Sequence, residues 1–178
     1  MLYARIPLER VGVLIGPGGG TKRRIEERTE TKLVIDSTTG EVTLDESKAK
    51  DPSLALKARD VVAAIGRGFS EERAVRLLND DVYLQVLEIK DYAKSRSRLE
   101  EIRGRVIGSQ GKTRRLIEEL TGADMSVHGH TVAVIAESFQ LTVAVEAVEM
   151  ILRGSEHSTV YRFLERKRAL LRVQEMGF

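Results

Sequence analysis

The sequence predicts an α+β protein made of two copies of one β-α-α-β-β-α module, followed by a C-terminal helix. The first observation behind this prediction is an internal repeat, because residues 15–29 and 107–121 share nine identical pairs in 15 aligned positions. The second is that strand-like and helix-like patterns follow one another in the same order around each copy. The third is size, because 178 residues can hold two small domains but not two large ones.

The elements of the first module follow from local patterns. We expect a strand over 2–7, a helix over 8–15, a glycine loop, a helix over 21–29, strands over 32–36 and 41–45, and a helix from Pro52 to Gly66. The two later strands flank a Ser-Thr-Thr-Gly turn that ends at Gly40. Pro52 is typical of a helix start, and Gly66 and Gly68 are typical of a helix end.

The second module repeats this order. We expect a strand over 82–89, a helix over 98–107, a second glycine loop, a helix ending at Leu120, strands over 124–128 and 131–136 around Gly129, and a helix over 141–152. Apolar residues recur at helical spacing in the last helix, and Gly154 ends it. Each module is therefore expected to form a three-stranded sheet packed by helices.

Four segments follow from these elements. They are a first module over 1–68, a connecting helix over 69–80, a second module over 81–154 and a basic C-terminal helix over 155–178. Ser70 is a suitable N-cap for the connecting helix. In the C-terminal helix, Val160, Phe163, Leu164 and Leu171 predict a face that packs on the body of the protein.

Composition excludes several kinds of site. The chain has no cysteine and three histidines, so disulfide frameworks, thiolate zinc sites and cysteine nucleophiles are excluded. We expect no metal and no cofactor, because His128 and His130 have no third ligand nearby and fit the rim of a turn. The N-terminal residues do not have the pattern of a secretory signal, and the chain has no run of 18 apolar residues, so we expect a cytoplasmic protein.

The positive charge is local. The formal net charge is only +2, yet residues 10–25 and 102–117 contain four and five basic residues and no acidic residue. Each basic stretch is centred on a glycine loop, over 16–19 or 108–111. Glycine lets the backbone approach a phosphate closely, and the helix that follows offers free N–H groups. Both loops are therefore suited to bind an anion.

Two common phosphate motifs do not fit these loops. A P-loop that ends in Gly111-Lys112-Thr113 needs a glycine five positions before Gly111, where Val106 stands. A dinucleotide fingerprint fails because Thr21 stands where its last glycine belongs. The sequence has no constellation typical of a catalytic site, so we expect a binding protein and no enzyme.

The spacing that remains is Val106-Ile107-Gly108-x-x-Gly111-Lys112-Thr113, followed by Ile117-Glu118-Glu119. It resembles the type I K-homology (KH) domain, which has a GXXG loop between its first two helices. The resemblance extends to both modules. It implies a groove that clamps about four single-stranded nucleotides, with phosphates at the loop and bases on an aliphatic floor. The strands over 33–36 and 124–128 would contribute to that floor.

Carried onto this chain, the resemblance implies RNA contacts in both modules. In the first module they are Ile15, Gly16, Pro17, Gly18, Gly19, Lys22 and Arg23. In the second they are Arg103, Arg105, Val106, Ile107, Gly108, Ser109, Gln110, Gly111, Lys112, Arg114 and Arg115. The arginines after each loop have an alternative, because they can pair with glutamates one helical turn away.

The first loop departs from the pattern at two positions. Pro17 removes a donor N–H, and Gly20 stands where the second module has Lys112, so we expect a weaker grip. In the second loop, aspartate at both Gly108 and Gly111 is expected to abolish most RNA binding at a nearly unchanged thermal midpoint.

Twin KH modules with a basic tail that contains Ser158 and Tyr161 resemble archaeal members of the partner-of-Nob family of small-subunit ribosome-assembly factors. This resemblance implies that the partner is single-stranded RNA near the 3′ end of small-subunit rRNA, together with an rRNA-processing endonuclease or a translation initiation factor. The alternative is an adaptor that binds a nuclease or translation factor with little direct RNA contact. The basic run over 162–172 fits an RNA track, a partner contact or a solvated face.

Overall fold

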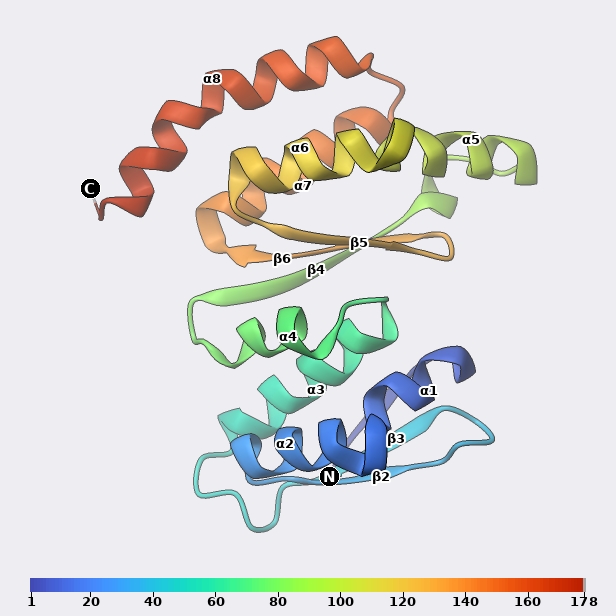
Figure 1. Cartoon of the computed structure of the whole chain (residues 1–178), viewed down its shortest axis with the longest axis vertical. Coiled ribbons are helices and arrows are strands. Elements are labelled where there is room, and N and C mark those ends of the chain that lie inside the picture. The colour runs from blue at the N-terminus through green and yellow to red at the C-terminus, as the bar shows by residue number, and fades with distance from the viewer. Residues whose placement is uncertain (178) are drawn as a thin grey trace. The chain divides into compact units, whose positions relative to one another are not determined.

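Residues 1–177 are described by a computed structural model, and they form two compact units. The first unit spans Met1–Asp80, and the second begins at Asp81. Each unit has its own three-stranded sheet and its own helices (Figure 1). The prediction of an α+β protein with two β-α-α-β-β-α modules is confirmed.

The first unit contains the predicted strands and helices of the module, a short 3-10 helix in the glycine loop, and two further helical segments after the helix that ends at Gly66. The elements, with η for 3-10 helices, are β1 (Leu2–Arg5), α1 (Leu8–Ile15), η1 (Pro17–Gly19), α2 (Gly20–Thr29), β2 (Lys32–Ile35), β3 (Glu41–Asp45), α3 (Ser53–Gly66), α4 (Glu71–Ala74) and η2 (Val75–Leu78). Pro7 stands directly before α1, where no helical hydrogen bond needs its missing N–H.

The second unit has the same order. Its elements are β4 (Val82–Glu88), η3 (Ile89–Asp91), α5 (Arg96–Ile107), η4 (Ser109–Gly111), α6 (Lys112–Thr121), β5 (Asp124–His128), β6 (Thr131–Glu137), α7 (Ser138–Leu152) and α8 (His157–Glu175). The Ser95 side chain accepts a hydrogen bond from the Arg98 backbone N–H at 3.2 Å. This cap starts α5 two residues before the predicted position.

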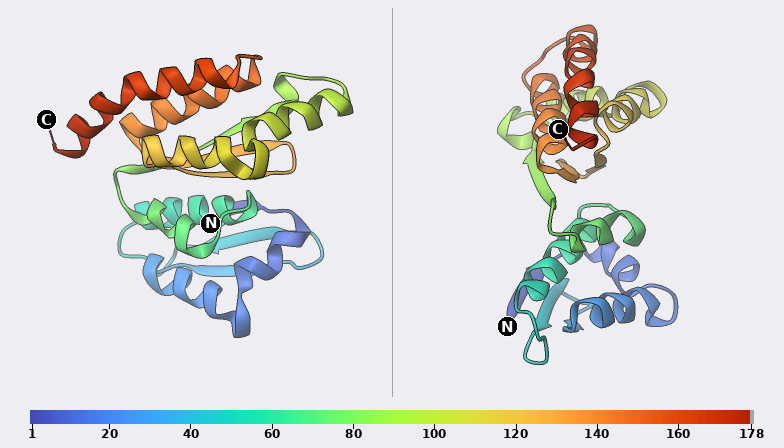
Figure 2. Two further views of the ribbon diagram at one scale, coloured as in Figure 1. Left: turned by 45° about the horizontal axis from the view of Figure 1, so that its top comes forward. Right: turned by 90° about the vertical axis from the view of Figure 1, so that its left-hand side faces the viewer.

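Both sheets are antiparallel, and the last strand of each module lies in the centre. The strand orders are β1-β3-β2 and β4-β6-β5. Leu33 lies opposite Leu44 in the first sheet, and Met125 lies opposite Val134 in the second. All four side chains are buried. The helices of each module gather on one face of its sheet (Figure 2).

The core of the second unit is aliphatic. Ile102, Ile117 and Val148 join α5, α6 and α7 in one buried cluster, and each is 0 % exposed. Burying a side chain of this size contributes about 1.5–3 kcal/mol. Val160 and Leu164 of α8 belong to the same cluster, so the predicted packing face of that helix is confirmed.

Residues 69–80 pack as part of the first unit. Phe69 and Leu77 are 1 % and 2 % exposed, and α4 and η2 contact α3. In the second unit, α8 contacts α6 and α7 in the corresponding way. α4 begins six residues after Ile65, and α8 begins six residues after Ile151. Each module therefore has a fourth helix, and the segment expected to be a connector is the fourth helix of the first module.

Candidate nucleic-acid interface

Each glycine loop is a bend between two helices, and its backbone has nearly the same conformation in both modules. The first glycine has a φ of 72° at Gly16 and 78° at Gly108. The last glycine has a φ of 74° at Gly19 and 75° at Gly111. The third loop residue is left-handed in both modules, although it is glycine in one and Gln110 in the other. The loops are thus equivalent in shape as well as in spacing.

The first glycine of each loop is required by packing. A Cβ atom on Gly16 would lie 2.2 Å from Thr21 Oγ1, and one on Gly108 would lie 2.3 Å from Thr113 Oγ1. Both threonines are buried, so they have no room to move aside. The expectation that aspartate at Gly108 leaves the thermal midpoint unchanged conflicts with this packing.

The last glycine of each loop faces open space. No atom from another part of the described chain lies within 4 Å of a Cβ built on Gly19, and the nearest to one on Gly111 is the far end of Arg114 at 3.9 Å. This glycine is the N-cap of α2 or α6, and no side chain of residues 1–177 caps either helix. The N–H of the first helical residue donates to a loop carbonyl, from Gly20 to Pro17 and from Lys112 to Ser109. The helix dipole still favours an anion at this end of each helix.

Two cations lie beside the second loop without a partner of their own. Lys112 and Arg115, in the first turn of α6, are exposed and have no ion pair among residues 1–177. Arg114 differs, because its Nη1 lies 2.5 Å from Glu118 Oε1. The sequence offered such a pair with a glutamate one helical turn away as the alternative to an RNA contact. The charge available to an anion at the second loop is therefore that of Lys112 and Arg115.

Two arginines of the second module that are predicted to contact RNA donate hydrogen bonds to backbone carbonyls. Arg105 donates to the carbonyl oxygen of Ile151 at 3.3 Å and to that of Ser155. These bonds link the end of α7 to α5 and give Arg105 a structural role, and its RNA contact stays a prediction. Arg103 donates through Nε to the carbonyl of Gly129 at 3.0 Å. That exposed bond links α5 to the β5–β6 turn.

The apolar floor is smaller than predicted. Val106 is 0 % exposed and belongs to the core, so its predicted RNA contact is corrected, because its side chain has no accessible surface. Ile15 and Ile107, the last residues of α1 and α5, are half-buried next to the first loop glycine. Ile35 of β2 and Val127 of β5 are half-buried. Each lies on the same face of its strand as the buried residue two positions earlier, Leu33 or Met125, and this face points toward the helices. These four residues form the available floor.

Two glycines of this surface were missed by sequence reasoning. Gly12 and Gly104 lie inside α1 and α5, where glycine costs about 1 kcal/mol relative to alanine. Both are exposed, and within the described residues no non-neighbouring atom lies within 4 Å of a Cβ built on either. Packing therefore does not require them, and they allow a ligand to approach the helix backbone. Their separation of 92 residues, the offset of the repeat, is the signal that could have found them.

The first loop has its own set of cations. Arg23 donates through Nη2 to the carbonyl of Gly18 at 2.9 Å, so its exposed side chain folds onto the loop. Lys22 is half-buried, and Pro17 is exposed at the tip of the bend. The first loop thus brings basic side chains to the bend by a different arrangement from the second.

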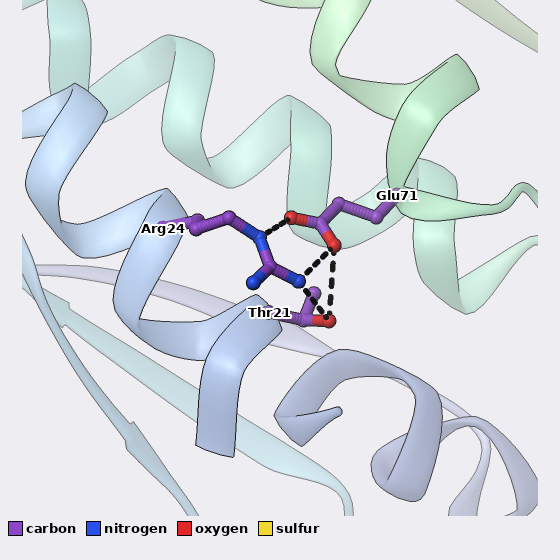
Figure 3. A network of polar contacts seen from close by, with 3 residues as sticks. All are labelled: Thr21, Arg24 and Glu71. Atoms are coloured by element: carbon purple, nitrogen blue, oxygen red, sulfur yellow. Dashed lines mark hydrogen bonds and ion pairs between the residues drawn. The ribbon is translucent and has the colours of Figure 1, made fainter. Parts of the chain in front are cut away.

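Arg24 of α2 forms a network with Glu71 of α4 and with Thr21 (Figure 3). Its Nε and Nη2 lie 2.5 Å and 2.7 Å from the two carboxylate oxygens of Glu71. The Thr21 hydroxyl donates to Glu71 Oε2 at 3.1 Å. The hydrogen bond from Arg24 is the main cause that lowers the pKa of the Glu71 carboxyl. The fourth helix of the first module is thus attached to the start of α2 by a charged pair.

In the second module, a tyrosine takes the place of this carboxylate. Tyr161 of α8 lies with its hydroxyl 2.9 Å from Thr113 Oγ1. The Tyr161 ring stacks on His157 with 5.9 Å between centroids. His157 Nε2 lies 2.8 Å from the carbonyl oxygen of Arg105, in the last turn of α5. The fourth helix of this module therefore contacts both helices that flank the loop.

Residues 1–177 contain no group of three or more histidine, cysteine, aspartate or glutamate side chains that is placed to hold a metal ion. His130 lies 3.9 Å from Glu100, beside the β5–β6 turn. None of the helices in this range is both long and apolar enough to cross a membrane.

Two family models match the chain. Residues 3–50 match the KH domain, and residues 83–169 match a model for the second KH domain of PNO1, described as a eukaryotic type KH-domain (KH-domain type I). A KH domain-containing protein of Methanocaldococcus jannaschii, MJ0443, is 51 % identical over 165 residues, which cover 92 % of this chain and 72 % of that protein.

Two solved structures from Pyrococcus horikoshii are similar over both units. The structure of Dim2p is 50 % identical and covers 93 % of this chain and 98 % of its own, with a TM-score of 0.87. The complex of a/eIF2alpha, aDim2p and rRNA contains a chain 49 % identical, with coverage of 94 % and 93 % and a TM-score of 0.89.

Proposed function

This chain belongs to the family of KH domain proteins whose second domain is of the PNO1 type, and from this premise we propose that it binds single-stranded RNA through its GXXG loops as a small-subunit ribosome-assembly factor. The observation that carries the proposal is the second loop. There an uncapped helix start, an open last glycine and the unpaired cations Lys112 and Arg115 meet at one point. The role is one of recognition rather than catalysis.

The second loop holds a sugar–phosphate strand by two kinds of contact. Backbone N–H groups at the start of α6, other than that of Lys112, donate to phosphate oxygens, and the Lys112 and Arg115 side chains neutralise the charge. The bases lie toward Ile107 and Val127, and Gly104 leaves room for them. Such a groove accepts unpaired bases, since a duplex keeps its base edges paired.

The first loop takes a phosphate in the same way but with one donor fewer, because Pro17 has no N–H. Gly16, Gly18 and Gly19 give it the same bend as the second loop. We therefore expect each module to contact RNA, and the second module to supply the larger share of the affinity.

The partners that we propose for this chain are based on those of a relative. The aDim2p chain of Pyrococcus horikoshii occurs in a complex with a/eIF2alpha and rRNA. We propose small-subunit rRNA near its 3′ end as the RNA, and a translation initiation factor or the rRNA-processing endonuclease as protein partner, with assembly in the cytoplasm.

The test measures binding of a fluorescent 12-nucleotide single-stranded RNA from the 3′ end of an archaeal small-subunit rRNA. Changing Lys112 and Arg115 to alanine is expected to weaken binding roughly 30-fold or more, because two charge-assisted contacts are lost. The slope of log affinity against log salt should fall by about 1.4 in magnitude, or 0.7 for each phosphate contact. The matched control changes Lys48 and Lys50, two exposed lysines beyond β3, to alanine and keeps the wild-type affinity.

The same variants separate RNA binding from the adaptor role. If the wild-type chain captures a/eIF2alpha but binds no RNA, the adaptor is correct and the RNA proposal is refuted. If the Lys112 and Arg115 variant loses RNA but keeps a/eIF2alpha, the two partners use different surfaces.

A further inference from the structure

The two modules differ together at two positions of the helix after the loop. The second module has Lys112 at the helix start and Leu116 one turn later, whereas the first has Gly20 and Arg24. The Arg24 guanidinium folds back over Gly20, because a Cβ built on Gly20 would lie 3.1 Å from Arg24 Nη1. The guanidinium of one residue thus occupies the space that a side chain at the other would need.

Glu71 determines the orientation of this guanidinium. It accepts hydrogen bonds from Arg24 Nε at 2.5 Å and from Nη2 at 2.7 Å, while Nη2 also lies 3.4 Å from the Thr21 hydroxyl (Figure 3). The two parallel bonds form a bidentate pair, which fixes the plane of the guanidinium. Nη1 has no hydrogen-bond partner among residues 1–177, and it is the nitrogen beside Gly20.

The surroundings of Nη1 favour an anion. The Arg24 side chain is 57 % exposed, so a ligand can reach it. It lies at the start of α2, where no side chain caps the helix. A cation at this end of a helix is opposed by the helix dipole unless a negative group is present. Glu71 offsets that cost on one side of the guanidinium, and a phosphate would do so on the other.

We propose that Arg24 is the phosphate-binding cation of the first loop, oriented by Glu71 and given room by Gly20, in the role that Lys112 has in the second loop. The inference rests on the proposed function, because it requires that the first loop binds an RNA phosphate. The absence of a lysine at position 20 then does not mean that the first loop has lost its phosphate site, because the cation is supplied by Arg24. Arg24 Nη1 donates to a phosphate oxygen while Nε and Nη2 stay on Glu71.

The test is an exchange of residues between the modules in the full chain. Arg24→Leu, which copies the second module, is expected to weaken binding of the 12-nucleotide RNA roughly tenfold. The magnitude of the salt slope should fall by about 0.7, the value for one phosphate contact on a single strand. Adding Gly20→Lys to Arg24→Leu copies both residues of the second module and should restore the affinity and the slope. Gly20 has helical φ and ψ, so the lysine fits the backbone there.

The rescue distinguishes ligand binding from a structural role. If Arg24 served only to attach α4, lysine at position 20 would not restore binding, and that result would overturn the inference. Arg24→Gln, which can still donate to Glu71 but has no charge, should lose more RNA affinity than its loss of stability explains. Unaltered binding by this variant would also overturn it.

A control and the wild type separate this inference from the proposed function. Arg28→Leu removes the same charge from the exposed face of α2 one turn further from the loop, and it should leave the affinity unchanged. If the wild-type chain does not bind the RNA, the proposed function fails. If the wild type binds and Arg24→Leu binds equally well, only the assignment of Arg24 fails.

Discussion

Glu26 and Glu118, equivalent residues of the two modules, each accept a hydrogen bond from a backbone N–H of the next strand, at 2.8 Å and 3.3 Å. Thr29 and Thr121 each donate to the carbonyl one turn earlier at 2.6 Å. The fold therefore accounts for these repeated residues. It gives no such role to Arg115, whereas the side chain of its counterpart Arg23 donates to a loop carbonyl. A residue that the repeat keeps and the fold does not need is a strong candidate for a ligand contact.

The two glycines of the second loop should differ in what alanine costs. Gly108→Ala is expected to lower the free energy of unfolding by about 3 kcal/mol, because the methyl group would overlap Thr113 and the backbone is left-handed. Gly111→Ala should cost about 1–2 kcal/mol, the conformational penalty alone, because its Cβ meets open space. Urea unfolding of both variants measures the difference.

RNA affinity is a second measurement that should distinguish these two variants. Gly111→Ala should weaken RNA binding more than its small loss of stability explains, because the methyl group would enter the proposed phosphate site. Equal stabilities for the two variants would contradict the packing argument, whatever the RNA result.

At the scale of elements, the fourth helix of each module is attached to the threonine that follows the loop. In the first module, Glu71 of α4 accepts from Thr21, and in the second, Tyr161 of α8 contacts Thr113. Each threonine also packs against the first glycine of its loop. In both modules the fourth helix therefore contacts the loop through this threonine. The contact is made by a carboxylate in the first module and by a phenol in the second.

The carboxylate makes the attachment of α4 sensitive to acid. Arg24 lowers the pKa of Glu71 below the ordinary 4.5, so the pair contributes stability that is complete above that value. This stability is lost as the pH falls through the lowered pKa of the folded state. We expect amide hydrogens of α4 and η2, corrected for intrinsic exchange, to exchange faster at about pH 3 than at about pH 7.

Glu71→Gln is the matched variant for this pH dependence. It is nearly isosteric and does not titrate, so α4 should exchange faster than wild type at neutral pH and respond less to acid. The same pH dependence in both proteins would assign the effect to other carboxyls of the unit.

At the scale of the whole molecule, the chain divides at Asp80 rather than at the end of the third helix of the first module. Phe69, Ala74 and Leu77 lie beyond that helix, and each is at most 2 % exposed. Arg10 of α1 also donates to the carbonyl of Phe69 at 2.9 Å. The first unit is therefore complete only when its fourth helix is included.

Truncation tests this boundary. A fragment of residues 1–80 should fold, whereas a fragment of residues 1–68 should be destabilised by on the order of 5 kcal/mol, enough to unfold a marginal domain. Circular dichroism and urea unfolding compare the two fragments. Equal stability would show that residues 69–80 are a mere connector.

Periodicity, glycine positions and the 92-residue repeat were enough to derive the strand and helix order, both sheets and both loops. These features are local, since a left-handed bend depends on the residues within it and helical spacing shows within one segment. The same local patterns did not show that Val106 lies in the core or that Arg105 binds backbone carbonyls, because neither contact can be read from neighbouring residues.

What only the tertiary structure decided are the contacts between distant segments. Glu71 meets Arg24 across 47 residues and Tyr161 meets Thr113 across 48. Such pairs arise when packing of an apolar face brings two helices together, and packing depends on the whole set of buried side chains. The sequence by itself determined the position of both glycine loops and of the basic residues around them, because these features are local. The fold determined which of those basic side chains have partners, because the partners lie far away in the chain.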